Sequence, residues 1–134
     1  MRLGASTLTT NTTGNYNTAL GSQAMRWNTE GTYNVALGYN ALKGKEQATP
    51  ITGNFNVAIG QSALRDLKDG ASNVALGSAS LMQCASGTYN IGLGKGTLYS
   101  LVSGNNNVAI GRDAGYYIEG LSLIHISEPT RLGF

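Results

Sequence analysis

Few side chains in this sequence are suited to catalysis, and the strongest candidates are two carboxylates. Asp66 and Asp69 lie three residues apart in the segment QSALRDLKDG (61–70). Paired acids hydrolyse glycosides only when they flank a cleft at a set separation. Here both belong to one variable segment and stand beside Arg65 and Lys68. This pattern indicates a solvated surface rather than a catalytic pair.

Two further features resemble binding motifs without matching them. The string GLGKGT (92–97) resembles a phosphate-binding loop, but it lacks the G-x-x-x-x-G-K-[ST] order. The single cysteine, Cys84, excludes an intrachain disulfide and indicates a buried apolar side chain. Metal-ligand spacing of Cys and His is absent. We therefore expect no catalytic residue, no cofactor and no metal ion, and we predict that the chain is not an enzyme.

The amino-acid composition argues against a nucleic-acid partner and against a membrane span. Only 12% of the 134 residues are charged, and the net charge is +2. Lys and Arg are scattered rather than clustered, which argues against a nucleic-acid partner. No apolar run reaches the roughly 18 residues that a membrane span needs, so we expect none.

The C-terminal residues 121–131 read LSLIHISEPTR. This string resembles the in-frame translation of a transposon-end adapter used in sequencing libraries. We therefore expect residues 121–134 to be an adapter-derived artefact that packs poorly against the rest, and the chain to be a metagenomic fragment without its true C-terminus. Excluding this segment removes the single histidine, His125, and with it any Ser-His-Asp or Cys-His catalytic set.

An internal repeat dominates residues 1–120. The unit reads G-x-x-N-[VTI]-[AG]-[LI]-G-x-x-[AST]-[LMG] and continues into a short variable segment. Units start at Gly14, Gly31, Gly53, Gly70, Gly87 and Gly104. Four of these spacings are 17 residues, and the second is 22 because of an insertion near residues 43–52 (KGKEQATPIT). A partial seventh unit opens the chain, where LGASTL (3–8) aligns with LGSQAM (20–25).

The tetrad Asn-Val-Ala-Leu in the unit predicts a short strand, because it alternates and carries a β-branched residue. We predict that Val35 and Leu37 point into the core, while Asn34 and Ala36 face the other way. That opposite face would be slim, with Ala or Gly at its centre, and would let another sheet or chain approach closely. The same division is predicted for Val57/Ile59, Val74/Leu76 and Val108/Ile110.

A glycine follows each predicted strand and marks a chain reversal, where a positive φ is cheap only for glycine. These turn glycines are Gly21, Gly38, Gly60, Gly77, Gly94 and Gly111. The next residues, such as Ala41 and Leu42, tuck a second apolar side chain inward. We predict short helical turns here, with a second short strand as the alternative. In the third unit, residues 61–70 would form one or two helical turns that end at Gly70.

A 17-residue unit cannot bury its own apolar face, whereas stacked units form a continuous core. We therefore predict one all-β domain over residues 1–120, a parallel β-solenoid or β-roll of about seven 17-residue rungs. Stacking would align the asparagines of successive rungs in a hydrogen-bonded ladder, with direct ligand contact as their alternative role. The predicted ladder residues are Asn17, Asn34, Asn56, Asn73, Asn90 and Asn107.

An aromatic residue stands just before the ladder asparagine in four units, at Tyr16, Tyr33, Phe55 and Tyr89. We interpret these rings as an edge stripe whose members stack on one another. A carbohydrate-binding aromatic row is the alternative.

The unit G-N-x-N-[VT]-A-[LI]-G-x-x-A-[LG] is similar to the repeats of phage tail fibres and related tail proteins. It also resembles the head repeats of trimeric autotransporter adhesins, whose units read close to S-V-A-I-G-x-x-A. Residues 53–64 and 104–115 match best, and the resemblance covers residues 3–117. Adhesin head repeats are usually shorter, so the 17-residue spacing favours the tail-fibre resemblance.

The resemblance implies a structural and adhesive homotrimer that spaces or displays receptor-binding parts. It places the protein in the virion as a tail fibre or, alternatively, on a bacterial cell surface, with a host cell-surface receptor or glycan as its partner. An ice- or glycan-binding solenoid is a weaker alternative, because ice binders need a flat Thr ladder and the equivalents of Thr18 are Val or Ile. A solenoid glycosidase that uses Asp66, Asp69 and Asp113 rests on fold analogy alone.

Overall fold

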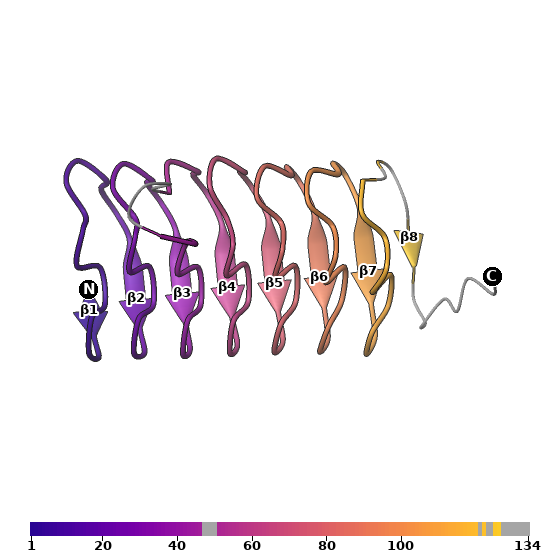
Figure 1. The fold of residues 1–134 in the computed structure, drawn as a ribbon, viewed down its shortest axis with the longest axis horizontal. Coiled ribbons are helices and arrows are strands. Elements are labelled where there is room, and N and C mark those ends of the chain that lie inside the picture. The colour runs from indigo at the N-terminus through magenta and orange to yellow at the C-terminus, as the bar shows by residue number, and fades with distance from the viewer. Residues whose placement is uncertain (47–50, 121, 123–124, 127–134) are drawn as a thin grey trace.

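The computed structural model describes residues 1–46, 51–120, 122 and 125–126, and it shows a parallel β-solenoid (Figure 1). Its short strands lie side by side in chain order and form one parallel sheet along the length of the molecule. The prediction of an all-β parallel solenoid is confirmed. The strands are β1 (Arg2–Leu3), β2 (Thr18–Leu20), β3 (Val35–Leu37), β4 (Val57–Ile59), β5 (Val74–Leu76), β6 (Ile91–Leu93), β7 (Val108–Ile110) and β8 (His125–Ile126).

The sheet register follows the sequence repeat. Ala19 of β2 pairs with Ala36 of β3, and Ala36 pairs with Ala58 of β4 although 22 residues separate them. A slip of one residue would exchange the two faces of a strand, so the buried face fixes this register. The insertion in the second full unit therefore leaves the sheet undisturbed.

The strands bury the face that we predicted to point away from the core, so our assignment of the two sheet faces is wrong. Ala36 and Asn34 are fully buried, whereas Val35 and Leu37 are only half-buried. The rung is thin, and its interior at the strand is filled by other small residues. The fully buried small residues include Ala24, Ala41 and Ala63 from the turn segments. Alanine fits this narrow space where valine or leucine would overfill it.

The segment after each turn glycine is a series of tight turns, so the predicted helical turns are wrong. The backbone takes positive φ at Ser62 (59°) and Leu64 (47°), which interrupts a right-handed helix. The Ala63 N–H donates to Gly60 O within the segment, while the Leu64 N–H donates to Ser80 O of the next rung. Alternate N–H groups therefore close local turns and bind the neighbouring rung, and no residue described in the structure is helical.

The stack is regular on both sides of the insertion, at Gly44 and at Ile51. The Gly44 N–H still donates to Arg65 O of the next rung, 2.8 Å away. Ile51 is fully buried in the core, and its carbonyl accepts hydrogen bonds from the N–H groups of Thr29 and Gly31. The ladder hydrogen bonds are thus intact at Gly44 and at Ile51, on the two sides of the insertion.

In the interior at β6, a smaller residue in the strand is combined with larger residues in the turn segments. Gly92 of β6 takes the place that alanine has in the other full units, and it lies against the Ser80 and Thr97 hydroxyls. These hydroxyls are 2.6 Å apart and replace the alanines of other turn segments. An added Cβ on Gly92 would lie 2.5 Å from Ser80 Oγ and 2.7 Å from Thr97 Oγ1. The missing methyl group makes room for the hydroxyl pair.

We expect Gly92→Ala to lower the free energy of unfolding by about 1–3 kcal/mol, because it overpacks a closed site. The triple variant Ser80→Ala, Gly92→Ala, Thr97→Ala should recover most of this loss, since it recreates the surroundings of Ala36 and Ala58. Urea denaturation followed by circular dichroism measures both values. A triple variant as unstable as the single one would show that the Ser80 and Thr97 hydroxyls are not the reason why glycine is needed at position 92.

Strand β8 lies in the segment that resembles an adapter. His125 pairs with Val108 of β7, 17 residues earlier, and the Asn105 N–H donates to Ser122 Oγ at 3.3 Å. His125 and Ser122 are both exposed. The other residues of 121–134 lie outside the described part of the chain, so the adapter origin of this segment stays a prediction.

Candidate functional site

The ladder asparagines lie inside the solenoid, where each amide links its own rung to its neighbours. Asn56 is fully buried, and its Nδ2 donates to Asn34 Oδ1 at 3.1 Å and to Gly70 O at 3.0 Å. Its Oδ1 accepts from the Asn73 backbone N–H and from Asn73 Nδ2, both at 3.0 Å. An amide that is buried and bonded on both sides cannot reach a ligand, so Asn56 has a structural role.

The same pattern repeats along the stack. Nδ2 of Asn34, Asn73 and Asn90 donates to the carbonyl oxygen of the glycine that opens the next unit, at 2.7–2.8 Å. Because each asparagine also accepts from the next rung, the ladder opposes any axial slip between rungs.

The carboxylates considered for catalysis have different surroundings. Asp66 is buried and accepts two hydrogen bonds from Arg65, from Nε at 2.7 Å and from Nη2 at 3.0 Å. Asp69 is exposed, and Asp113 lies 3.3 Å from Arg112 Nε at the surface. The hydrogen bond to Asp66 raises the pKa of Arg65. A carboxylate held in this bidentate pair is an acceptor for Arg65, and it lacks the free geometry of a general acid.

The thiol and the glycine-rich string also have structural surroundings. Cys84 is fully buried, and burial raises the pKa of its thiol to about 11, so it is protonated at neutral pH. In GLGKGT (92–97), Gly92 belongs to β6, and Lys95 is exposed in the following turn segment. The described residues contain no group of three or more His, Cys, Asp or Glu side chains placed to hold a metal ion.

The outer face of the sheet is an apolar surface that follows the stack. Each full unit places the first and third residues of its strand on this face, and none of these twelve positions is charged. Leu76 is 37% exposed and Ile110 is 47% exposed. The face consists of Thr18, Leu20, Val35, Leu37, Val57, Ile59, Val74, Leu76, Ile91, Leu93, Val108 and Ile110. We call it the aliphatic face.

Sequence reasoning selected these residues but placed them in the core. The signal that could have corrected it is the uniform Ala or Gly between them, since a central position limited to the smallest side chains marks the tighter of two faces.

Three exposed aromatic rings form a continuous stack beside the strands. The ring centroids of Tyr16 and Tyr33 are 4.7 Å apart, and those of Tyr33 and Phe55 are 5.0 Å apart at an interplanar angle of 5°. The rings therefore cover one another's faces and present their edges to water. A sugar stacks on the face of a ring, so this arrangement favours the edge-stripe interpretation for these three residues over the carbohydrate row.

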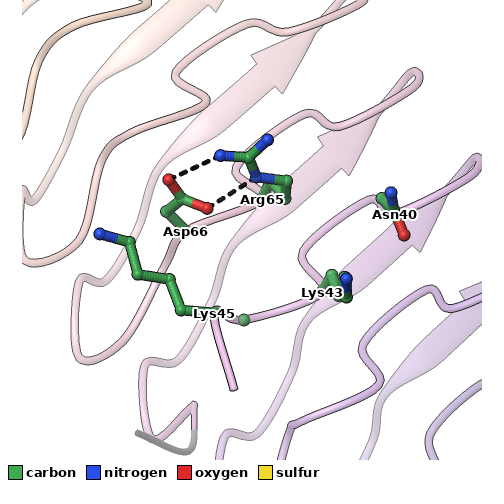
Figure 2. Close-up of a pocket in the computed structure, with 6 residues that line it drawn as sticks. Asn40, Lys43, Lys45, Arg65 and Asp66 are labelled. Atoms are coloured by element: carbon green, nitrogen blue, oxygen red, sulfur yellow. Dashed lines mark hydrogen bonds and ion pairs between the residues drawn. The ribbon is translucent and has the colours of Figure 1, made fainter.

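A polar pocket lies beside the insertion, and sequence reasoning missed it. It has a volume of about 430 Å³ and is lined by Asn40, Lys43, Gly44, Lys45, Arg65 and Asp66 (Figure 2). The signal in the sequence was the break in the 17-residue spacing together with three cations, two of them within the insertion.

Compared with protein-family models, curated proteins and solved structures, the chain matches none of them. Over its described residues the chain has no apolar helix of membrane-spanning length.

Proposed function

We propose that this chain is a non-catalytic structural segment of a homotrimeric adhesive fibre, in which copies pack through the aliphatic face. The repeat resemblance to phage tail fibres supports a tail-fibre segment of a virion that spaces or displays receptor-binding parts. A head segment of a trimeric adhesin on a bacterial surface is the alternative from the same resemblance.

The observation that carries the proposal is the aliphatic face itself. Six rungs at ~4.8 Å and strands of three residues give it a footprint of roughly 300 Å². A contiguous apolar patch of this size is comparable to the largest patch on a typical monomer, and such patches are often functional. The face is flat, uncharged and continuous along the stack, as a contact between rod-shaped copies requires.

The solenoid form favours a copy of the same chain as the partner. Each rung from β3 to β7 presents Val or Ile at the first position of its strand and Leu or Ile at the third, so two rods can pack in register along these rungs. The parallel register also makes the contact area grow with each added rung. Rotational packing of three such faces around one axis would remove all of them from water.

The test is the mass of the full chain in solution, measured by light scattering over a concentration range. A trimer has three times the mass of the 14.0 kDa chain. The variant Leu76→Lys should dissociate it, because a lysine ammonium would be buried in the middle of the contact without a partner. We expect at least a tenfold higher concentration for half-assembly.

Val102→Lys is the matched control. Val102 is 45% exposed and lies outside the aliphatic face, at the repeat position that Lys68 occupies in another unit. It adds the same charge at a site that accepts lysine, so assembly should stay unchanged. A folded wild-type chain that remains a monomer at all concentrations would refute the proposal, as would equal effects of the two variants.

A further inference from the structure

We propose that the pocket beside the insertion binds the acidic group of a carboxylate-bearing saccharide. This site is separate from the aliphatic face and does not depend on the oligomeric state.

The charge of the pocket favours an anionic ligand. Lys43, Lys45 and Arg65 contribute three positive charges, and Asp66 contributes one negative charge, which leaves an excess of two. Asp66 is occupied by Arg65 Nε and Nη2, so both lysines keep their charge uncompensated within the pocket. Figure 2 shows this Arg65–Asp66 pair at one side of the pocket, with Lys45 and Lys43 along the neighbouring rung. A concave site with an excess of one sign of charge concentrates ions of the opposite sign.

The guanidinium of Arg65 is preorganised to bind an anionic ligand. The bidentate pair with Asp66 fixes the plane of the guanidinium, and Nη1 takes no part in that pair. A guanidinium whose orientation is already fixed loses little entropy when it binds a carboxylate.

The insertion creates the pocket. In the other rungs the chain continues directly along the stack, whereas here it turns away after Gly44 and carries Lys45 with it. Gly44 has a φ of +78°, and an added Cβ would lie 3.1 Å from Trp27 Cβ and 3.2 Å from Ile51 Cγ1. This close packing holds the backbone of Gly44 in place. The pocket is therefore already formed in the folded chain before a ligand binds.

The size and lining of the pocket favour a saccharide over a bare anion. Its volume of about 430 Å³ lies in the range of small-molecule sites and exceeds what a simple oxyanion fills. Its lining contains no apolar side chain, and Asn40 adds a neutral amide. The Asn40 Oδ1 is buried without a hydrogen-bond donor among the described residues.

The experiment is a titration of the full chain with glucuronic acid at low salt, followed by amide chemical-shift changes. We expect saturable shifts at Lys43, Gly44 and Arg65, and at least ~5-fold weaker binding of glucose and of acetate. The double variant Lys43→Gln, Lys45→Gln should weaken glucuronic acid binding by about tenfold or more, since two of three cations are lost.

The double variant Lys68→Gln, Lys95→Gln is the control. It removes the same charge from exposed positions outside the pocket and should leave the affinity unchanged. Thermal melts of both variants show that each is folded. Absence of binding, equal binding of glucose, or equal loss in the two double variants would overturn the site. Acetate binding as tightly as glucuronic acid would overturn the saccharide assignment.

Discussion

Gly77→Ala is expected to lower the free energy of unfolding by about 3–5 kcal/mol, a large loss for the addition of one methyl group. Gly77 has a φ of +133°, a region that other residues rarely adopt. An added Cβ would lie 2.5 Å from the carbonyl carbon and oxygen of Gly94 in the next rung. Both the strain and the clash involve backbone, which side-chain rotation cannot relieve.

The position in the stack makes this loss hard to avoid. The Gly77 N–H donates to Ile59 O and the Gly94 N–H donates to Leu76 O, at 2.8 Å and 2.7 Å. Moving the Gly77 backbone away from Gly94 would therefore break ladder hydrogen bonds on both sides. Buried backbone groups without partners are costly in themselves.

Gly120→Ala is the matched control, because an added Cβ there meets nothing within 4 Å. Its effect should stay within about 0.5 kcal/mol. Urea denaturation followed by circular dichroism measures both variants against the wild type. A Gly77→Ala midpoint close to that of Gly120→Ala would mean that the rungs separate more easily than the ladder geometry indicates.

The architecture could be predicted from the sequence because one physical constraint repeats along it. A fixed spacing of asparagine, small residue and glycine is compatible with stacked rungs and with few other folds. The insertion between Gly31 and Gly53 shows why the prediction held despite a change in spacing, because the strands of the flanking units keep their register across it.

The orientation of the strand could not be predicted from hydrophobicity. Alternation distinguishes the two faces of Val35–Leu37 but does not say which one is inside. The decision depends on the width of the rung, which is set by turn residues with positive φ such as Asn40 and Leu42. Hydrophobicity does not reveal such a width and therefore favours the aliphatic face as the core. The uniform Ala or Gly at the centre of the strand is the signal that indicates the narrow side.

The pocket could be predicted only in part from the sequence, in which the break in spacing marks its place but not its shape. Lys43 and Arg65 occupy equivalent places in successive rungs, so stacking alone brings them together. Lys45 joins them only because the chain departs from the stack after Gly44. The direction of that departure is a property of the packed structure around Trp27 and Ile51, which have no special spacing in the sequence.

Asn56→Asp is expected to be the most damaging change of the ladder at neutral pH, with a loss of about 3 kcal/mol or more. Asn56 Nδ2 donates to Asn34 Oδ1, Asn54 O and Gly70 O. A carboxylate oxygen in its place would face three acceptors in a fully buried site. Asn56→Ala is the companion variant, because it removes the amide without adding a charge.

The pH dependence separates the two variants. Burial and the three facing oxygens favour the protonated carboxyl, so the pKa of the introduced Asp should rise above its usual value of ~3.9 in the folded state. A group whose pKa is raised by folding stabilises the fold below its unfolded pKa and loses that contribution as pH rises through its folded pKa. Relative to wild type at each pH, the deficit of Asn56→Asp should therefore be smallest below about pH 4 and should grow towards neutral pH.

Asn56→Ala should show a deficit that is independent of pH, because it adds no titrating group. Urea denaturation of both variants and of the wild type between acid and neutral pH gives the comparison, and the wild type accounts for ionic groups such as the Arg65–Asp66 pair. Parallel curves for the two variants would mean that water reaches the introduced carboxylate. The ladder would then open locally around Asn56, and its asparagines would be less essential to the stack than their hydrogen bonds indicate.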